Sequence, residues 1–463
     1  MPDLALDDVQ GFIVRTYAMP ALRVFALRVE HAAAAGQLLG ALVGGDPSVP
    51  QLATAAPWGA KPEVCVNVGF THTGLAALGV ASEDLASFAE EFVQGPVARA
   101  PRVGDVGDSA PERWVGSFAS GAVHALAFLF AQTEEALETA TARLRAACAA
   151  GAAFSELSMY DARALPGNVA HFGYRDGFSQ PVIDGGPPPL VPDVLPKAPP
   201  GEFLLGHPSQ YESFVYPVPQ PQPLGLNGSF VAFRILEQDC AGFERFLTAA
   251  SAQTGLDREL IAAKLVGRWR SGVPLALSPH APDPDLPLEQ YNAFDYAPTP
   301  EVPGAYDDRR GDRCPIGSHI RRMNPRHSAV AGNSGLKRRL VRRGLPYGPP
   351  YDPEHPDDGI ARGLLGLFIG VSLKDQFEFL MSDWANKGTF APGLRGTRDP
   401  VLGDNSAPDA TFLLPIEGGR TVEVTGLSRF VTCRGAAYCF LPSVTAIRYL
   451  SARATARAIS VGV

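Results

Sequence analysis

Four times along the chain, a run of closely spaced apolar residues precedes a segment whose apolar residues recur every three or four positions. Runs dense in Val, Ile, Phe and Leu favour β-strands, whereas the longer spacing is typical of an amphipathic helix. The pattern therefore predicts strand–helix pairs at 22–29 and 31–42, 123–130 and 134–149, 230–236 and 241–252, and 364–371 and 374–384. Thr133 stands where the second helix begins and is a suitable N-cap, because its hydroxyl can accept a backbone N–H.

A proline-rich stretch separates the first two pairs from the last two. Proline at this density blocks helices and interior strands, so the stretch is expected to be a connector. The sequence thus predicts an N-terminal domain at 1–186, a connector at 187–227 and a C-terminal domain at 228–463. Each domain is expected to be α+β, with an antiparallel sheet and helices on one face.

Composition places the chain among ordinary globular proteins, with 46% hydrophobic and 19% charged residues in 463. A net charge of −8 argues against a protein that coats nucleic acid or an anionic membrane. The acidic N-terminal sequence is unlike a signal peptide and no apolar run could span a bilayer, so a cytoplasmic location is expected. The six cysteines form no zinc pattern and are expected to be small buried hydrophobes, without a disulfide.

A basic stretch at 309–343 stands out in this acidic chain, with eleven Lys or Arg residues and a single acid, Asp312. It contains the segment Cys-Pro-Ile-Gly-Ser-His-Ile-Arg-Arg-Met-Asn-Pro-Arg at 314–326, and thus His319. A solvated basic face is one interpretation. Alternatively, the stretch faces an anion, which could be a nucleic acid, carboxylates of the fold, or the propionates of a cofactor.

Two further segments hold candidate polar groups. Residues 173–181 read Gly-Tyr-Arg-Asp-Gly-Phe-Ser-Gln-Pro, which places Asp176 on a glycine-bounded turn that permits close backbone approach to a flat ligand. Residues 341–348 read Val-Arg-Arg-Gly-Leu-Pro-Tyr-Gly, so either Arg342 or Arg343 could project into a site. Each motif by itself is also compatible with an ordinary surface turn.

Together, these segments resemble the dye-decolorizing peroxidases, a family of haem enzymes. Segments 8–15, 363–379 and 434–442 resemble the family in the same order, so the resemblance covers nearly the whole chain. The length and the long loops are similar to those of the larger subgroup. The resemblance implies two ferredoxin-like α+β domains and one haem b per chain, bound in the C-terminal half.

The resemblance also implies roles for individual residues. His319 corresponds to the axial ligand of the haem iron, Asp176 to the distal acid/base, and Arg342, rather than Arg343, to the distal arginine. Gly177, Phe178, Ser179 and Phe368 belong to segments expected to contact the cofactor. An acid is expected to support the axial histidine, with Asp399 preferred over Asp404.

The implied activity is reduction of hydrogen peroxide with oxidation of dyes, phenols or other aromatic donors, with an acidic pH optimum. A haem-carrying or haem-processing protein with weak peroxidase activity is the alternative. Trp384 or Tyr347 could relay electrons from bulky dyes at the surface, although packing is the simpler role for each. If so, Trp384→Phe would lower turnover of bulky dyes selectively. The sequence leaves the natural reductant and the oligomeric state open.

Overall fold

The computed structural model describes residues 4–211, 213–300, 302–326, 335–416 and 419–461. Its main element is an eight-stranded antiparallel sheet in the order β4-β1-β3-β2-β10-β5-β7-β6. The strands of this sheet are β1 (Ala21–Val29), β2 (Val64–Phe70), β3 (Ala125–Ala131), β4 (Phe154–Arg163), β5 (Ser229–Gln238), β6 (Val341–Tyr347), β7 (Gly363–Gly370) and β10 (Val431–Leu441). A separate hairpin pairs β8 (Thr411–Ile416) with β9 (Arg420–Thr425).

The sheet has two four-stranded halves, one from each half of the chain, as the sequence predicted. The halves meet where β10 pairs with β2, at Phe440 and Phe70. The outermost strands, β4 and β6, lie next to each other, so the sheet curls around a shared core. Alternate residues of the strands fill this core, including Phe128 and Phe233.

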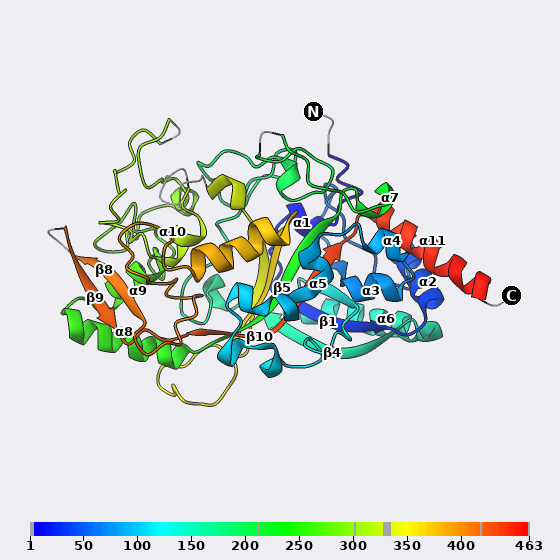
Figure 1. Cartoon of the computed structure of the whole chain (residues 1–463), viewed down its shortest axis with the longest axis horizontal. Coiled ribbons are helices and arrows are strands. Elements are labelled where there is room, and N and C mark those ends of the chain that lie inside the picture. Colours follow the sequence, from blue (N-terminus) through cyan, green and yellow to red (C-terminus); the bar gives the residue numbers. More distant parts are fainter. Residues whose placement is uncertain (1–3, 212, 301, 327–334, 417–418, 462–463) are drawn as a thin grey trace.

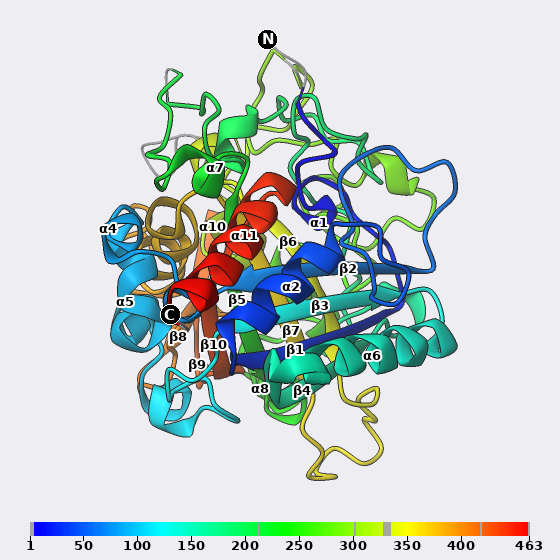
Figure 2. The same cartoon turned by 90° about the vertical axis from the view of Figure 1, so that its right-hand side faces the viewer.

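Helices cover the outer faces of the curled sheet. In Figure 2, α2, α6 and α11 lie across the strands of the N-terminal half. In Figure 1, α8 and α9 lie beside the hairpin of β8 and β9, at the end of the molecule away from α11. The helices are α1 (Gly11–Val14), α2 (Ala32–Leu42), α3 (His72–Ala77), α4 (Ser82–Leu85), α5 (Glu90–Arg99), α6 (Glu134–Ala149), α7 (Gln222–Gly225), α8 (Cys240–Thr254), α9 (Arg258–Val266), α10 (His319–Met323) and α11 (Val444–Val461).

The predicted strand–helix pairs are confirmed, with small shifts at their ends. Thr133 caps α6 by accepting a hydrogen bond from the backbone N–H of Ala136. The predicted helix at 374–384 has wider, π-helical turns, η10 (Leu373–Glu378) and η11 (Leu380–Ala385). All six cysteines are buried and free.

Several strands gave no clear signal in the sequence. β4 is an edge strand with many half-buried positions, so its apolar pattern is weak. β6 contains Pro346, which an interior strand would not tolerate. It is accommodated because β6 is the other edge of the sheet and pairs only with β7.

The C-terminal helix links the two halves, because α11 follows β10 of the second half and packs on α2 of the first. The division at 1–186, 187–227 and 228–463 stays a prediction. Among the residues that the structure describes, no helix is both long and apolar enough to cross a bilayer.

Candidate active site

A cavity of about 320 Å³ lies against the outer face of the C-terminal half-sheet. The sheet register places Arg342 of β6 opposite Phe368 of β7, and Phe368 opposite Ala232 of β5. Because successive residues of a strand point to opposite faces, Arg342 and Phe368 face the cavity, as does Arg234. Their neighbours in sequence, such as Leu367, face the shared core.

His319 lines this cavity from the first position of α10. Its Nδ1 lies 3.0 Å from Oδ2 of Asp399. The other carboxylate oxygen of Asp399 accepts hydrogen bonds of 2.8 Å from the backbone N–H groups of Val401 and Leu402. With Nδ1 occupied by Asp399, Nε2 is the nitrogen that His319 can offer to a metal.

The charge of Asp399 is stabilised although the residue is fully buried. Burial raises the pKa of Asp399, but the contact with His319, the backbone hydrogen bond from Leu402 and the charge of Arg322 lower it, and the pKa lies below its usual value. Asp404, the other acid that the sequence offered, forms ion pairs with Arg398 and Arg429 instead. Asp399 is therefore the acid that contacts His319, as preferred from the sequence.

Asp176 lines the same cavity and faces Arg342. The two guanidinium nitrogens of Arg342 lie 3.4 and 3.5 Å from the carboxylate oxygens of Asp176, and one of them also donates to the backbone oxygen of Ser179 at 3.1 Å. The positive charge of Arg342 holds the pKa of Asp176 below its usual value, despite the opposing effect of burial. The exposed fraction of the Asp176 side chain, 53%, is high because the side chain faces the cavity.

The turn that carries Asp176 has the backbone conformation expected from its glycines. Gly173 and Gly177 have φ values of +85° and +91°, which residues with a Cβ rarely adopt. The backbone N–H of Asp176 donates to the oxygen of Asn168 at 2.9 Å, which anchors the turn. The turn therefore presents the carboxylate of Asp176 to the cavity from a fixed backbone.

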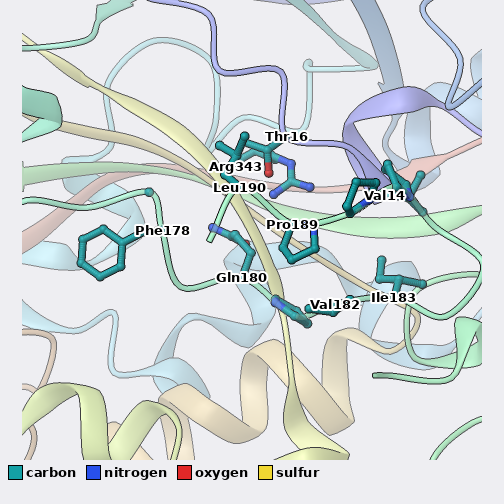
Figure 3. Close-up of a pocket in the computed structure, with 13 residues that line it drawn as sticks. Val14, Thr16, Phe178, Gln180, Val182, Ile183, Pro189, Leu190 and Arg343 are labelled. Atoms are coloured by element: carbon teal, nitrogen blue, oxygen red, sulfur yellow. The ribbon is translucent and has the colours of Figure 1, made fainter. Parts of the chain in front are cut away.

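Arg343 points to the opposite face of β6, as alternation requires. It lines a second pocket of only about 20 Å³, shown in Figure 3, and donates to the backbone oxygen of Phe12 at 2.8 Å. Burial lowers its pKa to about 9. Of the two adjacent arginines, Arg342 thus faces Asp176 and Arg343 does not.

Three of the four predicted cofactor contacts are cavity residues: Phe178, Ser179 and Phe368. Gly177 is different, because it lines the small pocket of Figure 3 and is absent from the lining of the large cavity. Gly177 lies between two residues that line the large cavity, Asp176 and Phe178, and its contact with the cofactor stays a prediction. Its contribution is the left-handed backbone that separates Asp176 from Phe178.

Arg234 is a further cation of the cavity that was not predicted from the sequence. Arg234 is 3% exposed and pairs with Asp105 at 2.5 Å. Its Nε has no hydrogen-bond partner among the described residues and is buried. The sequence did contain a sign of this residue. Arg234 is the single charged residue in the apolar run 230–236, and a charged side chain on a buried strand usually has a charged or polar partner.

The basic stretch at 309–343 is not a solvated face. Five of its arginines are buried, namely Arg321, Arg322, Arg326, Arg339 and Arg343. Arg326 and Arg339 line the cavity. Most of the hydrogen bonds that these five side chains donate go to backbone carbonyls of the fold. This burial removes the groups that a nucleic-acid surface would have to expose.

Neither candidate for an electron relay is an exposed aromatic. Trp384 is 4% exposed and packs against Phe379 and Phe390, which agrees with packing as the simpler role, and its use as an electron relay stays untested. Tyr347 is half-buried against the shared core, and burial raises its pKa well above the usual value. Packing is the role that the structure gives to both side chains.

Known proteins resemble this chain along nearly its full length. Residues 49–166 match the family model described as the DyP dimeric alpha+beta barrel domain. A dye-decolorizing peroxidase of Mycetinis scorodonius, msp1, is 31% identical over 96% of this chain and 87% of its own length. The multifunctional dye peroxidase DyP2 of an Amycolatopsis species is 29% identical and covers 96% of both chains.

Solved structures agree. The crystal structure of the fungal DyP-type peroxidase from Auricularia auricula-judae has a TM-score of 0.81 and 27% identity, over 97% of this chain and all of its own. A dye-decolorizing peroxidase in complex with 2,6-dimethoxyphenol has a TM-score of 0.79 and 26% identity over the same share of this chain. With the identity to msp1 extending over 96% of its residues, the chain belongs to the dye-decolorizing peroxidases, a family of haem-dependent enzymes.

Proposed function

We propose that His319 ligates the haem iron, that Asp176 is the acid/base of peroxide reduction and that Arg342 stabilises the charge that develops. The observation that carries this proposal is the meeting of two side-chain pairs at one cavity, His319 with Asp399 and Asp176 with Arg342. The reaction reduces hydrogen peroxide and oxidises dyes, phenols or other aromatic one-electron donors.

The cavity residues fit one haem b per chain. Aromatic and aliphatic side chains such as Phe178, Phe368 and Leu402 supply apolar walls for a flat ring. Arginines of the cavity supply cations for the propionates, and the unpartnered Nε of Arg234 is a donor that an anionic group would satisfy. His319 supplies an imidazole nitrogen, the ligand that iron in haem proteins commonly takes.

When bound, haem supplies the redox centre that accepts the two oxidising equivalents of peroxide. Asp176, as a carboxylate, takes a proton from one peroxide oxygen and returns it to the departing oxygen, which leaves as water. Arg342 stabilises the negative charge on that oxygen while the O–O bond lengthens, because its guanidinium already lies beside Asp176. Asp399 keeps the Nδ1 proton on His319 and so fixes the orientation of the imidazole.

Peroxide-dependent oxidation of 2,6-dimethoxyphenol by the haem-loaded protein, measured across pH, tests this function. The phenol is chosen because a related peroxidase was solved in complex with it. Because Asp176 must be ionised and its pKa is lowered, activity is expected to persist into acid and to fall only below the ordinary aspartate pKa of about 3.9. A histidine base would lose activity near pH 6.5.

An acidic optimum is compatible with this base. Loss of activity near pH 6.5 in a stable haem-loaded protein would contradict Asp176 as the working base. Absence of turnover despite bound haem would favour a haem-carrying protein instead.

A cytoplasmic location remains a prediction, which cell fractionation with immunodetection would test.

Trp384→Phe is expected to leave the ratio of bulky-dye to small-phenol turnover unchanged, because the indole is buried and cannot contact a dye. The replacement removes packing against Phe379 and Phe390 and should cost on the order of 1 kcal/mol of unfolding free energy. Steady-state rates with one bulky dye and one small phenol, together with urea unfolding, measure both effects. A selective loss of bulky-dye turnover would support Trp384 as a relay.

A further inference from the structure

Two consecutive arginines in α10, Arg321 and Arg322, are completely buried just after His319. Arg321 has a formal partner, since its Nη1 lies 3.1 Å from a carboxylate oxygen of Asp308. Arg322 binds three backbone carbonyls instead. Its Nε donates to Gly317 at 3.2 Å, and its two terminal nitrogens donate to Trp384 at 2.8 Å and to Thr397 at 2.7 Å.

These carbonyls come from three segments that meet behind His319. Gly317 lies in the turn before α10, Trp384 is the last residue but one of η11, and Thr397 lies two residues before Asp399. The backbone N–H of Asp399 donates to Ala385, the neighbour of Trp384, at 2.8 Å. Arg322 therefore ties the helix of His319 to both segments that position Asp399.

The charge of Arg322 has no carboxylate within ion-pair distance in the described ranges of the chain. Burial lowers the pKa of Arg322 to about 10, and the nearby charge of Asp399 opposes that shift. Asp399 in turn has His319 as its direct side-chain partner. Besides the backbone N–H groups of Val401 and Leu402, the buried carboxylate thus interacts with two side chains, His319 by contact and Arg322 at longer range.

We propose that Arg322 is a positioning residue that fixes the carboxylate of Asp399 against His319 and weakens the negative charge felt by the imidazole. A carboxylate on the far nitrogen of a ligating histidine makes the imidazole a stronger electron donor to the metal. A buried cation beside that carboxylate reduces this effect, and thereby raises the reduction potential of the haem iron. The inference rests on the proposed ligation of haem by His319.

The variants Arg322→Gln and Arg322→Lys distinguish the electrostatic effect of Arg322 from its effect on the position of Asp399. Glutamine removes the charge, so the reduction potential is expected to fall and the iron–histidine stretching frequency, measured by resonance Raman on the ferrous protein, to rise. Lysine keeps the charge but has one terminal nitrogen in place of the two that bind Trp384 and Thr397, so the potential should stay near that of the unmodified protein while the iron–histidine band broadens. Arg321→Lys is the matched control, with neither readout changed, because Arg321 holds Asp308 and not the Asp399 segment.

An Asp399→Asn background provides the decisive comparison. Without the carboxylate, Arg322→Gln should lower the potential less than it does with Asp399 present, because only the direct effect of the charge on the iron then remains. Equal potentials for Arg322→Gln and Arg322→Lys, or an equal fall with and without Asp399, would overturn the electrostatic part. If Arg322→Gln does not fold, the lysine variant decides, and a sharp, unshifted band there would overturn the positioning part.

The outcomes also separate this inference from the proposed function. A protein that binds haem and turns over peroxide, but whose potential is insensitive to the charge at 322, refutes the role of Arg322 alone. A protein that binds haem through a residue other than His319 refutes both.

Discussion

Asp176→Asn is expected to lower peroxide-dependent turnover by about 10²–10⁴-fold, the usual contribution of a positioned acid/base. Asparagine keeps the size of aspartate but cannot take a proton from peroxide and return it. It also removes the negative charge that now faces Arg342. The absorption of bound haem should remain, because the bond between His319 and Asp399 does not involve Asp176.

Stopped-flow mixing of the haem-loaded variant with peroxide measures this loss directly, before any reducing donor acts. Asp184→Asn is the matched control, because Asp184 is a half-exposed acid eight residues later that pairs with Lys197 and does not line the cavity. Turnover of the Asp176 variant within a factor of a few of the unmodified rate would rule out Asp176 as the acid/base. Loss of haem in the same variant would show a structural role instead.

His319→Ala is expected to abolish stoichiometric haem binding. The side chain is the imidazole of the cavity that a buried carboxylate orients, and alanine leaves no nitrogen to ligate iron. Asp399→Asn should act more weakly, with a loss of haem affinity of about 10–100-fold, because it disturbs a partner of the ligand and not the ligand itself. Titration of the apoprotein with haem, followed by the Soret band, measures both losses.

A histidine far from the cavity provides the control for this pair. His355 is an exposed residue bound to Asp352, and its replacement by alanine should leave haem binding unchanged. Circular dichroism establishes that the variants fold. Normal haem affinity in folded His319→Ala would mean that another residue ligates the iron, and the proposed arrangement of the site would then be incorrect.

The local elements were predictable because their causes are local. The apolar runs that became β1, β3, β5 and β7 and the three-to-four spacing of α2, α6 and α8 are properties of short segments. The edge strands β4 and β6 were not predicted, because their place at the edge of the sheet is a property of the tertiary structure. An edge position relaxes the demand for apolar residues and tolerates proline, so the signal that reveals an interior strand is weakened there.

A local sequence pattern could not decide between Arg342 and Arg343 as the residue that faces Asp176. Both residues have the same chemistry and adjacent positions, and the resemblance favoured Arg342. The physical reason is the register of β6 on β7, which sends alternate side chains to opposite faces. A shift of register by one residue would have placed Arg343 beside Asp176.

The burial of side chains decided between alternatives that the composition of the sequence had left open. From the sequence, the basic stretch could have been a solvated face and Trp384 a surface aromatic. The structure buries Arg321, Arg322 and Trp384 together around the segment of His319. An arginine that binds backbone carbonyls and an exposed arginine look identical in a sequence, because the carbonyls belong to segments distant along the chain.

The sequence by itself determined the fold class, the family and the residues able to ligate iron and transfer protons, because these follow from residue type, order and short-range spacing. Tertiary structure alone decided which of them meet. It brought His319 to Asp399 across 80 residues and Arg342 to Asp176 across 166, and it directed Arg343 and Gly177 to a different pocket. The reason is that strand register and loop packing, which fix these contacts, depend on the whole chain at once.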